Sequence, residues 1–228
     1  MYISSMKKIF IEGLAALSPL VLAQLDQVAA QHEGVIRIGV PGGRSAAPLI
    51  QGLLAAQDPV LSRVRLYLVD ERLSGDRNTD TLMAVGLAQA LAEGRMTADQ
   101  LVVPRLDEPL LREGEHLDLL YLGVGEDGHI SSLFPGSYPD LDARTTPQTV
   151  LVTNSPKPPL ERVTLSYRGF RTVAKQARTY LLFFGEGKRN ALDRLLAGKE
   201  NPSTLPCMFF PHEWFPVDLI TDLQEIRT

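Results

Sequence analysis

The feature that most constrains the fold of this chain is the regular alternation of short apolar runs with segments of helical spacing. The run 117–124 is almost continuously apolar, as expected for a strand that is buried on both faces of a parallel sheet. Strands that are separated by single helices indicate parallel βαβ units. We therefore predict an α/β fold, a mostly parallel sheet with helices on both faces, formed as a single domain over residues 1–228.

The individual elements follow from apolar periodicity and from the Gly, Pro and Ser residues that interrupt it. β-rich runs predict strands at 35–40, 64–69, 101–103, 117–124, 149–153, 163–166 and 179–184. Helical spacing predicts helices over 14–28, 45–56, 79–93, 167–176 and 186–197. Ser45 is the expected N-cap of the second helix, and Asp58-Pro59 predicts a turn. The proline-rich segment 202–216 has no pattern that predicts an element.

Composition and charge narrow the class of protein. The 228 residues include 23 Lys and Arg against 27 Asp and Glu, a net charge of −4, with no basic run, which argues against nucleic-acid binding. The longest uncharged stretch, 13–25, is too short to cross a bilayer. The single cysteine, Cys207, excludes an internal disulfide framework and is expected in the core. We therefore expect a cytoplasmic protein that binds neither nucleic acid nor membrane.

Four predicted strands end in chemically reactive or charged residues. These strand ends are 41–45, 70–72, 123–129 and 154–157. In parallel α/β sheets, ligands bind beyond the carboxyl ends of the strands. The sequence therefore predicts that these four segments meet around one ligand site.

The segment 123–128 matches the G-x-G-x-x-G pattern of dinucleotide-binding proteins, but its context differs. Pro135 and Gly136 follow almost at once and leave no room for the long helix that holds the pyrophosphate, and no acidic residue ends a second strand about 20 positions on. No H-E-x-x-H or C-x-x-C spacing provides metal ligands. We therefore predict neither a cofactor nor a metal.

Asp127-Gly128-His129 is the strongest candidate for catalysis. A histidine beside a carboxylate is the usual pair for proton transfer near neutral pH, and Gly128 permits the sharp turn that presents both side chains to one pocket. The alternative is a solvated turn histidine. The position at the end of a buried strand favours the catalytic interpretation.

A second group of residues predicts a site for an anion. Gly42, Gly43, Arg44 and Ser45 precede a predicted helix, whose free N–H groups favour negative charge. Each of these features also fits an ordinary turn or a solvated loop. Together they predict a small phosphorylated ligand, and the further cations at strand ends or on a stiff proline loop are Arg72, Lys157 and Arg162.

These motifs together resemble the 6-phosphogluconolactonase family, which shares a superfamily with glucosamine-6-phosphate deaminase. The similarity runs from about residue 35 to residue 188, and its most specific parts are the segments 118–136 and 155–165. In the deaminase branch an Asn-Glu-Pro stretch takes the place of 132–135, and the Ser-Pro-Lys-Pro-Pro segment seen here at 155–159 is absent. Both differences favour the lactonase branch.

The resemblance implies a Rossmann-like fold of the deaminase/ribose-5-phosphate isomerase/CoA-transferase type. It implies hydrolysis of 6-phospho-D-glucono-1,5-lactone to 6-phospho-D-gluconate, a step of the oxidative pentose phosphate pathway, without cofactor or metal. His129 would be the general base, and Asp127 would orient it. The residues implied to hold the substrate and its phosphate are Gly42, Gly43, Arg44, Ser45, Asp70, Arg72, Lys157 and Arg162.

Two other functions stay open at this point. One is aldose–ketose isomerisation of the deaminase type, and the other is a non-catalytic sensor of sugar phosphates. The expected partner is a small phosphorylated sugar lactone for the hydrolase, and the chain is expected to act as a monomer or homodimer.

Overall fold

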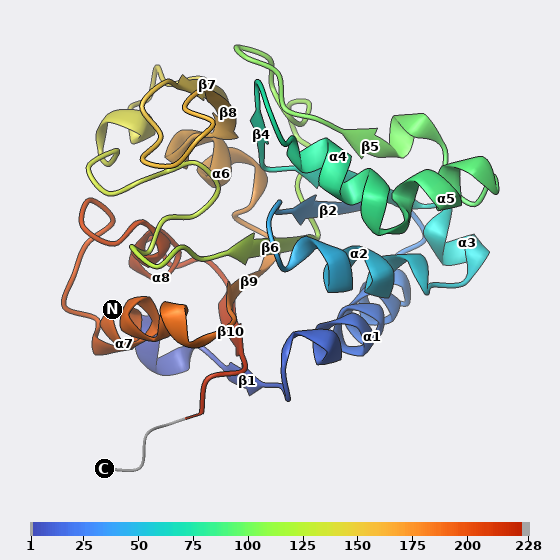
Figure 1. Ribbon diagram of the computed structural model, residues 1–228, viewed down its shortest axis with the longest axis horizontal. Helices are drawn as coiled ribbons and strands as arrows, with labels where there is room; N and C mark the ends of the chain where they lie inside the picture. Colours follow the sequence, from blue (N-terminus) through green and yellow to red (C-terminus); the bar gives the residue numbers. More distant parts are fainter. Residues whose placement is uncertain (1, 225–228) are drawn as a thin grey trace.

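The computed structural model describes residues 2–224 of the chain. Its main sheet has seven parallel strands in the order β1-β10-β9-β6-β2-β3-β5 (Figure 1). This arrangement confirms the predicted mostly parallel α/β fold. The strands are β1 (Lys8–Phe10), β2 (Ile36–Val40), β3 (Val64–Leu68), β5 (Leu101–Val102), β6 (Leu119–Gly123), β9 (Arg178–Phe183) and β10 (Val217–Thr221).

The central strand β6 shows why the run 117–124 is apolar at nearly every position. Leu119 and Tyr121 belong to the core on one face of the sheet, whereas Leu120 and Leu122 belong to the core on the other face. All four side chains are fully buried. Because side chains alternate along a strand, a strand that is covered on both faces needs apolar residues at consecutive positions.

Helices cover both faces of the main sheet (Figure 1). The first face carries α1 (Leu17–Ala29), α2 (Ala46–Leu54), α3 (Asp58–Leu61), α4 (Asn78–Leu82) and α5 (Ala88–Ala92). The second face carries α6 (Tyr167–Val173), α7 (Arg189–Ala197) and α8 (Phe209–His212). Within residues 2–224, no helix has both the length and the apolar character that a bilayer span requires.

A small antiparallel sheet adjoins the main sheet, in the order β4-β8-β7. Its strands are β4 (Asp70–Arg72), β7 (Thr149–Val152) and β8 (Arg162–Leu165). The strands predicted at 149–153 and 163–166 therefore exist, but they pair with each other and with β4 rather than with the main sheet. The pairing sets Arg72 opposite Arg162, so two of the predicted cations come together.

Two helix predictions are wrong in detail. The predicted helix 79–93 is divided into α4, a π-helical turn (Met83–Leu87) and α5, because Gly86 has a φ of 133° that interrupts the regular helix. Ser45 does not act as an N-cap through its side chain. Its backbone already has helical dihedral angles, and the α2 N-terminus is closed instead by the Ala46 N–H, which donates to the Gly43 carbonyl at 3.1 Å.

Several elements have no counterpart in the sequence prediction. The edge strand β1 and the strand β10 are both missed, and the turn at Asp58-Pro59 is the start of the short helix α3. The segment 202–216 contains a 3₁₀ turn (Pro206–Met208) followed by α8, and Cys207 lies fully buried there, as predicted. Except for β10, these elements have three or four residues each, which are too few to display a period.

Candidate active site

The order in which the chain adds strands to the sheet reverses at β2. The chain passes from β2 to β3 on one side and returns later to β6 on the other. Such a switch point leaves a crevice at the carboxyl ends of the strands. A cavity of about 500 Å³ opens here. Every predicted site residue except Asp127 lines it, namely Gly42, Gly43, Arg44, Ser45, Asp70, Arg72, His129, Lys157 and Arg162.

The His129 imidazole lies at the cavity wall and is held by Asp127. The distance from His129 Nδ1 to Asp127 Oδ1 is 2.5 Å, and the His129 backbone N–H donates to the same oxygen at 3.2 Å. Partial burial works to raise the pKa of Asp127, but the hydrogen bonds and the charge of His129 outweigh it and lower this pKa to about 2. A carboxylate at Asp127 favours the tautomer of His129 that carries its proton on Nδ1, and in that tautomer Nε2 is the acceptor.

The glycines around this pair are required by close packing rather than by a cofactor. A Cβ on Gly125 would lie 2.0 Å from His129 Nδ1 and 2.6 Å from Asp127 Oδ1. Gly128 has a φ of 85°, and a Cβ there would lie 2.2 Å from a methyl group of Leu205. The pattern that mimics a dinucleotide fingerprint therefore builds the turn that carries the His–Asp pair.

Asp70 is a buried carboxyl group that lines the cavity. Its Oδ2 accepts a hydrogen bond from the Ser132 hydroxyl at 2.7 Å, and the Asn78 side-chain amide donates to Oδ1 at 3.3 Å. Burial raises the pKa of Asp70, and the Ser132 hydrogen bond and the charge of Arg162 only partly counteract this effect. Asp70 is thus fixed in one orientation by two neutral donors.

The neighbouring Glu71 lies outside the cavity and starts helix α4. Its carboxylate accepts the backbone N–H groups of Asn78 and Thr79 at 2.7 and 2.9 Å, and it also accepts the Thr79 hydroxyl. These hydrogen bonds hold Asn78 against the glycine turn 42–45. A Cβ on Gly42 would lie 2.0 Å from Asn78 Oδ1. Gly42 is therefore required by a side chain at the start of α4, which sequence reasoning did not foresee.

Arg162 organises the loop that carries Lys157. Its Nη2 donates to the Lys157 carbonyl at 2.9 Å and its Nε donates to the Pro159 carbonyl at 3.1 Å. The guanidinium lies 5.8 Å from the ring centre of Phe134, and that ring lies 4.9 Å from the His129 ring. Arg162 therefore links the Lys157 loop to the histidine, in addition to facing the cavity.

The remaining predicted cations lie around the cavity mouth. Arg72 is held by a hydrogen bond from Nη1 to the Asp76 carbonyl at 2.7 Å, and Arg44 extends from the exposed turn before α2. The Ser45 hydroxyl lies beside Gly123, where a Cβ would be 3.4 Å away. The segments after β2 and β6 therefore meet here, as the strand-end argument predicts.

Lys188 is a cavity residue that the sequence analysis missed. It lies at the start of α7, directly after the turn that follows β9. Burial lowers its pKa, as do Arg44 and Lys157, whereas Glu126 raises it. The Lys188 ammonium therefore lies near two cations, Arg44 and Lys157, and near the carboxylates of Glu126 and Asp127. The signal that points to it is the Gly-x-Gly-Lys segment 185–188 between an apolar strand and a helix.

The donor set of the cavity is rich in nitrogen and poor in clustered acids. Within residues 2–224, no three His, Cys, Asp or Glu side chains come close enough together to form a metal site. The cavity instead combines one His–Asp pair, the carboxyl groups of Asp70 and Asp222, and five cationic side chains, Arg44, Arg72, Lys157, Arg162 and Lys188. This combination can move a proton at one end and hold an anion at the other.

The fold and the site together define an α/β protein with a cavity at the switch point of its sheet. Cationic side chains line this cavity, and a His–Asp pair that can transfer a proton lies at its wall. Residues 12–215 match the family model described as glucosamine-6-phosphate isomerases/6-phosphogluconolactonase. The chain belongs to this family.

Individual relatives agree with the family model. The chain is 30% identical to the 6-phosphogluconolactonase of Homo sapiens, an alignment that covers 88% of this chain and 85% of the human protein. It is also 30% identical to the enzyme of the same name from Pseudomonas putida, over 90% of this chain and 87% of that protein. The solved 6-phosphogluconolactonase structure from Shewanella baltica superposes with a TM-score of 0.74 at 23% identity, covering 97% of this chain and 99% of that one. The last match supports the fold alone.

Proposed function

We propose that this protein is a 6-phosphogluconolactonase, which hydrolyses 6-phospho-D-glucono-1,5-lactone to 6-phospho-D-gluconate. The observation that carries the proposal is the Asp127 side-chain oxygen 2.5 Å from His129 Nδ1, beside a cavity that gathers five cations. Lactone hydrolysis needs an activated water, a stabilised oxyanion and a proton for the leaving oxygen. The family's lactonase relatives support the same reaction.

His129 acts as the general base in this proposal. Its Nε2 takes a proton from a water molecule while the water oxygen attacks C1 of the lactone. The resulting imidazolium is stabilised by Asp127, which stays ionised because its pKa is about 2. Collapse of the tetrahedral oxyanion breaks the bond from C1 to the ring oxygen, and that oxygen takes the proton back from His129. The base is then restored for the next cycle.

The cations hold the 6-phosphate and so place C1 against the water. Lys157, Lys188 and Arg44 provide charge that no carboxylate within residues 2–224 neutralises at ion-pair distance. The glycine turn 42–45 adds backbone N–H groups beside α2, and Arg72 and Arg162 face the same space. Asp70 is proposed to bind a hydroxyl of the sugar ring. Fixing the phosphate restricts the lactone to one productive orientation.

Product analysis with purified protein tests the proposal directly. Supplied separately with 6-phospho-D-glucono-1,5-lactone and glucosamine 6-phosphate, the protein should form 6-phosphogluconate from the first, well above the spontaneous opening of the lactone. It should release no ammonia from the second. Ammonia and fructose 6-phosphate would replace the proposal with the isomerase reaction, and binding without turnover of either compound would indicate a sensor.

The proposal extends to the setting of the reaction. It includes a cytoplasmic location, a small phosphorylated sugar lactone as the partner, no binding of nucleic acid, and a monomer or homodimer as the active form. Fractionation of cells and light scattering on the purified protein measure the location and the assembly.

A further inference from the structure

The end of strand β10 packs against the turn that carries Lys188. The Thr221 hydroxyl donates to the Phe183 carbonyl at 2.8 Å and accepts the Leu223 N–H at 3.0 Å, which fixes the backbone on both sides of Asp222. The Asp222 carboxylate then accepts the Gly185 N–H at 2.9 Å. Asp222 therefore connects the last strand of the sheet to the first residue of the turn 185–188.

The same turn is confined from its other side. The Lys188 N–H donates to the Gly185 carbonyl at 2.9 Å, which closes the turn on itself. A Cβ on Gly187 would lie 3.0 Å from Glu126 Oε1, in the loop that also carries Asp127. Asp222 thus holds the first residue of the turn, Glu126 lies against Gly187, and Lys188 at the end of the turn lines the cavity.

Asp222 itself lines the cavity, yet its charge is unsuitable for contact with a phosphate. Two anions in one partly buried site repel each other, so a carboxylate among phosphate-binding cations needs another explanation. The hydrogen bond to Gly185 supplies it. We propose that Asp222 is a positioning residue, which holds the turn 185–188 so that Lys188 meets the 6-phosphate of the substrate.

This inference rests on the proposed function, because it assigns the phosphate to Lys188. It predicts different results for two substitutions at one position. Asp222→Ala removes the acceptor for the Gly185 N–H, so KM for the phospholactone should rise about 5- to 20-fold while kcat changes less than about threefold. Asp222→Asn keeps an acceptor oxygen and removes the negative charge, so its KM should equal or fall below that of the wild type.

The chain offers a matched control on the same strand. Asp218 also accepts a backbone N–H with its carboxylate, that of Lys7 at 2.9 Å, but it lies at the opposite end of β10 and does not line the cavity. Asp218→Ala should leave KM and kcat unchanged. Thermal unfolding of all variants shows whether a loss of function follows a loss of folded protein.

A second measurement does not depend on turnover. Binding of inorganic phosphate, followed by calorimetry, should weaken in Lys188→Ala and in Asp222→Ala, and the double variant should be no weaker than Lys188→Ala alone, because both changes disable the same contact. Additive losses, an unchanged phosphate affinity in Asp222→Ala, or a defect in Asp222→Asn equal to that of Asp222→Ala would overturn the inference. The phosphate affinities of the variants could follow this pattern although the wild-type protein does not hydrolyse the lactone. That result would refute the proposed function and still support the role of Asp222.

Discussion

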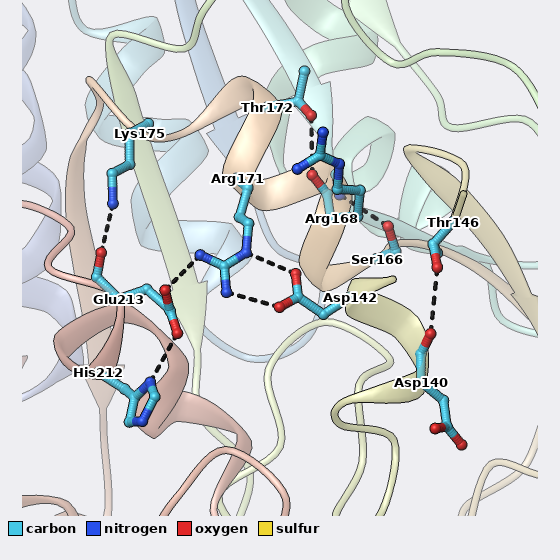
Figure 2. Close-up of polar contacts among 11 residues, drawn as sticks. Asp140, Asp142, Thr146, Ser166, Arg168, Arg171, Thr172, Lys175, His212 and Glu213 are labelled. Carbon is cyan, nitrogen blue, oxygen red and sulfur yellow. Dashed lines mark hydrogen bonds and ion pairs between the residues drawn. The ribbon is translucent and has the colours of Figure 1, made fainter. Parts of the chain in front are cut away.

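Two charged regions of this protein use similar side chains in opposite ways. In the first, which we call the Arg171 cluster, Arg171 from α6 donates from Nε and Nη2 to Asp142 at 2.7 Å each, and its Nη1 lies 2.5 Å from Glu213 (Figure 2). Lys175 donates to the Glu213 carbonyl, and His212 contacts the Glu213 carboxylate. The second region is the cavity, where Lys157, Lys188 and Arg44 converge with no such partners among the described residues.

The difference separates structural from functional charge. The Arg171 cluster joins the loop around Asp142 to α6 and α8 (Figure 2), and its charges neutralise one another in a half-buried place. Burial lowers the pKa of the half-buried Lys188, and the neighbouring charges of Arg44 and Lys157 lower it further, against the effect of Glu126. Like charges held together cost stability unless an anion joins them. The cavity is therefore incomplete without its ligand, whereas the Arg171 cluster is complete by itself.

The largest effect is expected at the His129–Asp127 pair. His129→Ala should lower kcat about 10²- to 10⁴-fold with little change in KM, because a general base acts mainly in the transition state. Asp127→Asn should lower kcat less, since it removes the charge that stabilises the imidazolium but retains the base. Rates are measured by 6-phosphogluconate formation after subtraction of the uncatalysed opening.

A structural role for His129 leads to a different result. The side chain would then matter for folding, and the folded fraction of His129→Ala would keep its normal turnover. Circular dichroism and thermal unfolding determine that fraction. A well-folded His129→Ala protein with near-wild-type kcat would refute the assignment and direct attention to Asp70, a buried carboxyl group at the cavity wall.

A matched pair of substitutions tests the comparison itself. Lys157→Met removes an unpaired cation from the cavity, so KM should rise about 10- to 150-fold while the unfolding temperature stays nearly constant. Arg171→Met leaves Asp142 and Glu213 without their partner. It should lower the free energy of unfolding by about 2–3 kcal/mol and the unfolding temperature by about 4–12 °C, with an unchanged KM.

Arg162→Ala is expected to combine the effects of these two substitutions. It removes a cavity cation and also the two hydrogen bonds that hold the Lys157 loop, so KM should rise and the free energy of unfolding should fall. Urea unfolding and steady-state kinetics on the same preparations separate the two effects. If Arg171→Met raised KM as much as Lys157→Met does, the division into structural and functional charge would be wrong.

Each of the two regions contains a carboxyl group whose pKa is lowered, and the cavity also contains one whose pKa is raised. Hydrogen bonds from Arg171 lower the pKa of Glu213, and His129 lowers that of Asp127 to about 2 against the effect of burial. A carboxyl group with a lowered pKa stabilises the fold above its unfolded pKa, near ~4, and loses this contribution as the pH falls toward the folded value. Asp70 works in the opposite direction, because burial raises its pKa and protonation removes the cost of its charge.

Activity should be lost earlier than stability. A protonated imidazole accepts no proton, so a reaction that uses His129 as its base slows as the pH falls. We therefore expect kcat/KM to fall by up to about tenfold per pH unit on the acid side while the unfolding temperature stays nearly constant, and the fold to weaken only below about pH 4. Parallel pH series of kinetics and thermal unfolding measure both. Coincident losses would mean that the acid limb reports unfolding rather than the base.

The cavity could be predicted from the sequence because its chemistry follows strands that are easy to recognise. The apolar runs before Gly42, Asp70 and Gly123 locate three strand ends, and a parallel sheet brings such ends to one edge. His129 needs only local information, since Asp127 is two residues away. The general rule for parallel sheets was therefore enough to predict that these strand ends meet.

The contributions that were missed depend on contacts between distant segments. β10 is set beside β9 by the sheet, and the Asp222–Gly185 bond follows from that pairing. Asn78 reaches below Gly42 only because Glu71 starts α4 at that point. The Ser45 cap was predicted from residue type alone, whereas the turn already gives Ser45 helical dihedral angles. Residue preferences do not contain this information.

The smallest effect is expected from metal removal, and here the prediction is no change. Dialysis against EDTA should leave kcat and KM within experimental error, because the proposed mechanism assigns the activation of water to His129 and the neutralisation of phosphate to lysine and arginine side chains. Within residues 2–224, the acidic and histidine side chains do not gather into groups of three that would hold an ion. The comparison requires the same protein assayed before chelation, after it, and after addition of Mg²⁺, Mn²⁺ or Zn²⁺. Activity that disappears in EDTA and returns with one of these ions would show that a metal, and not the His129–Asp127 pair alone, activates the water.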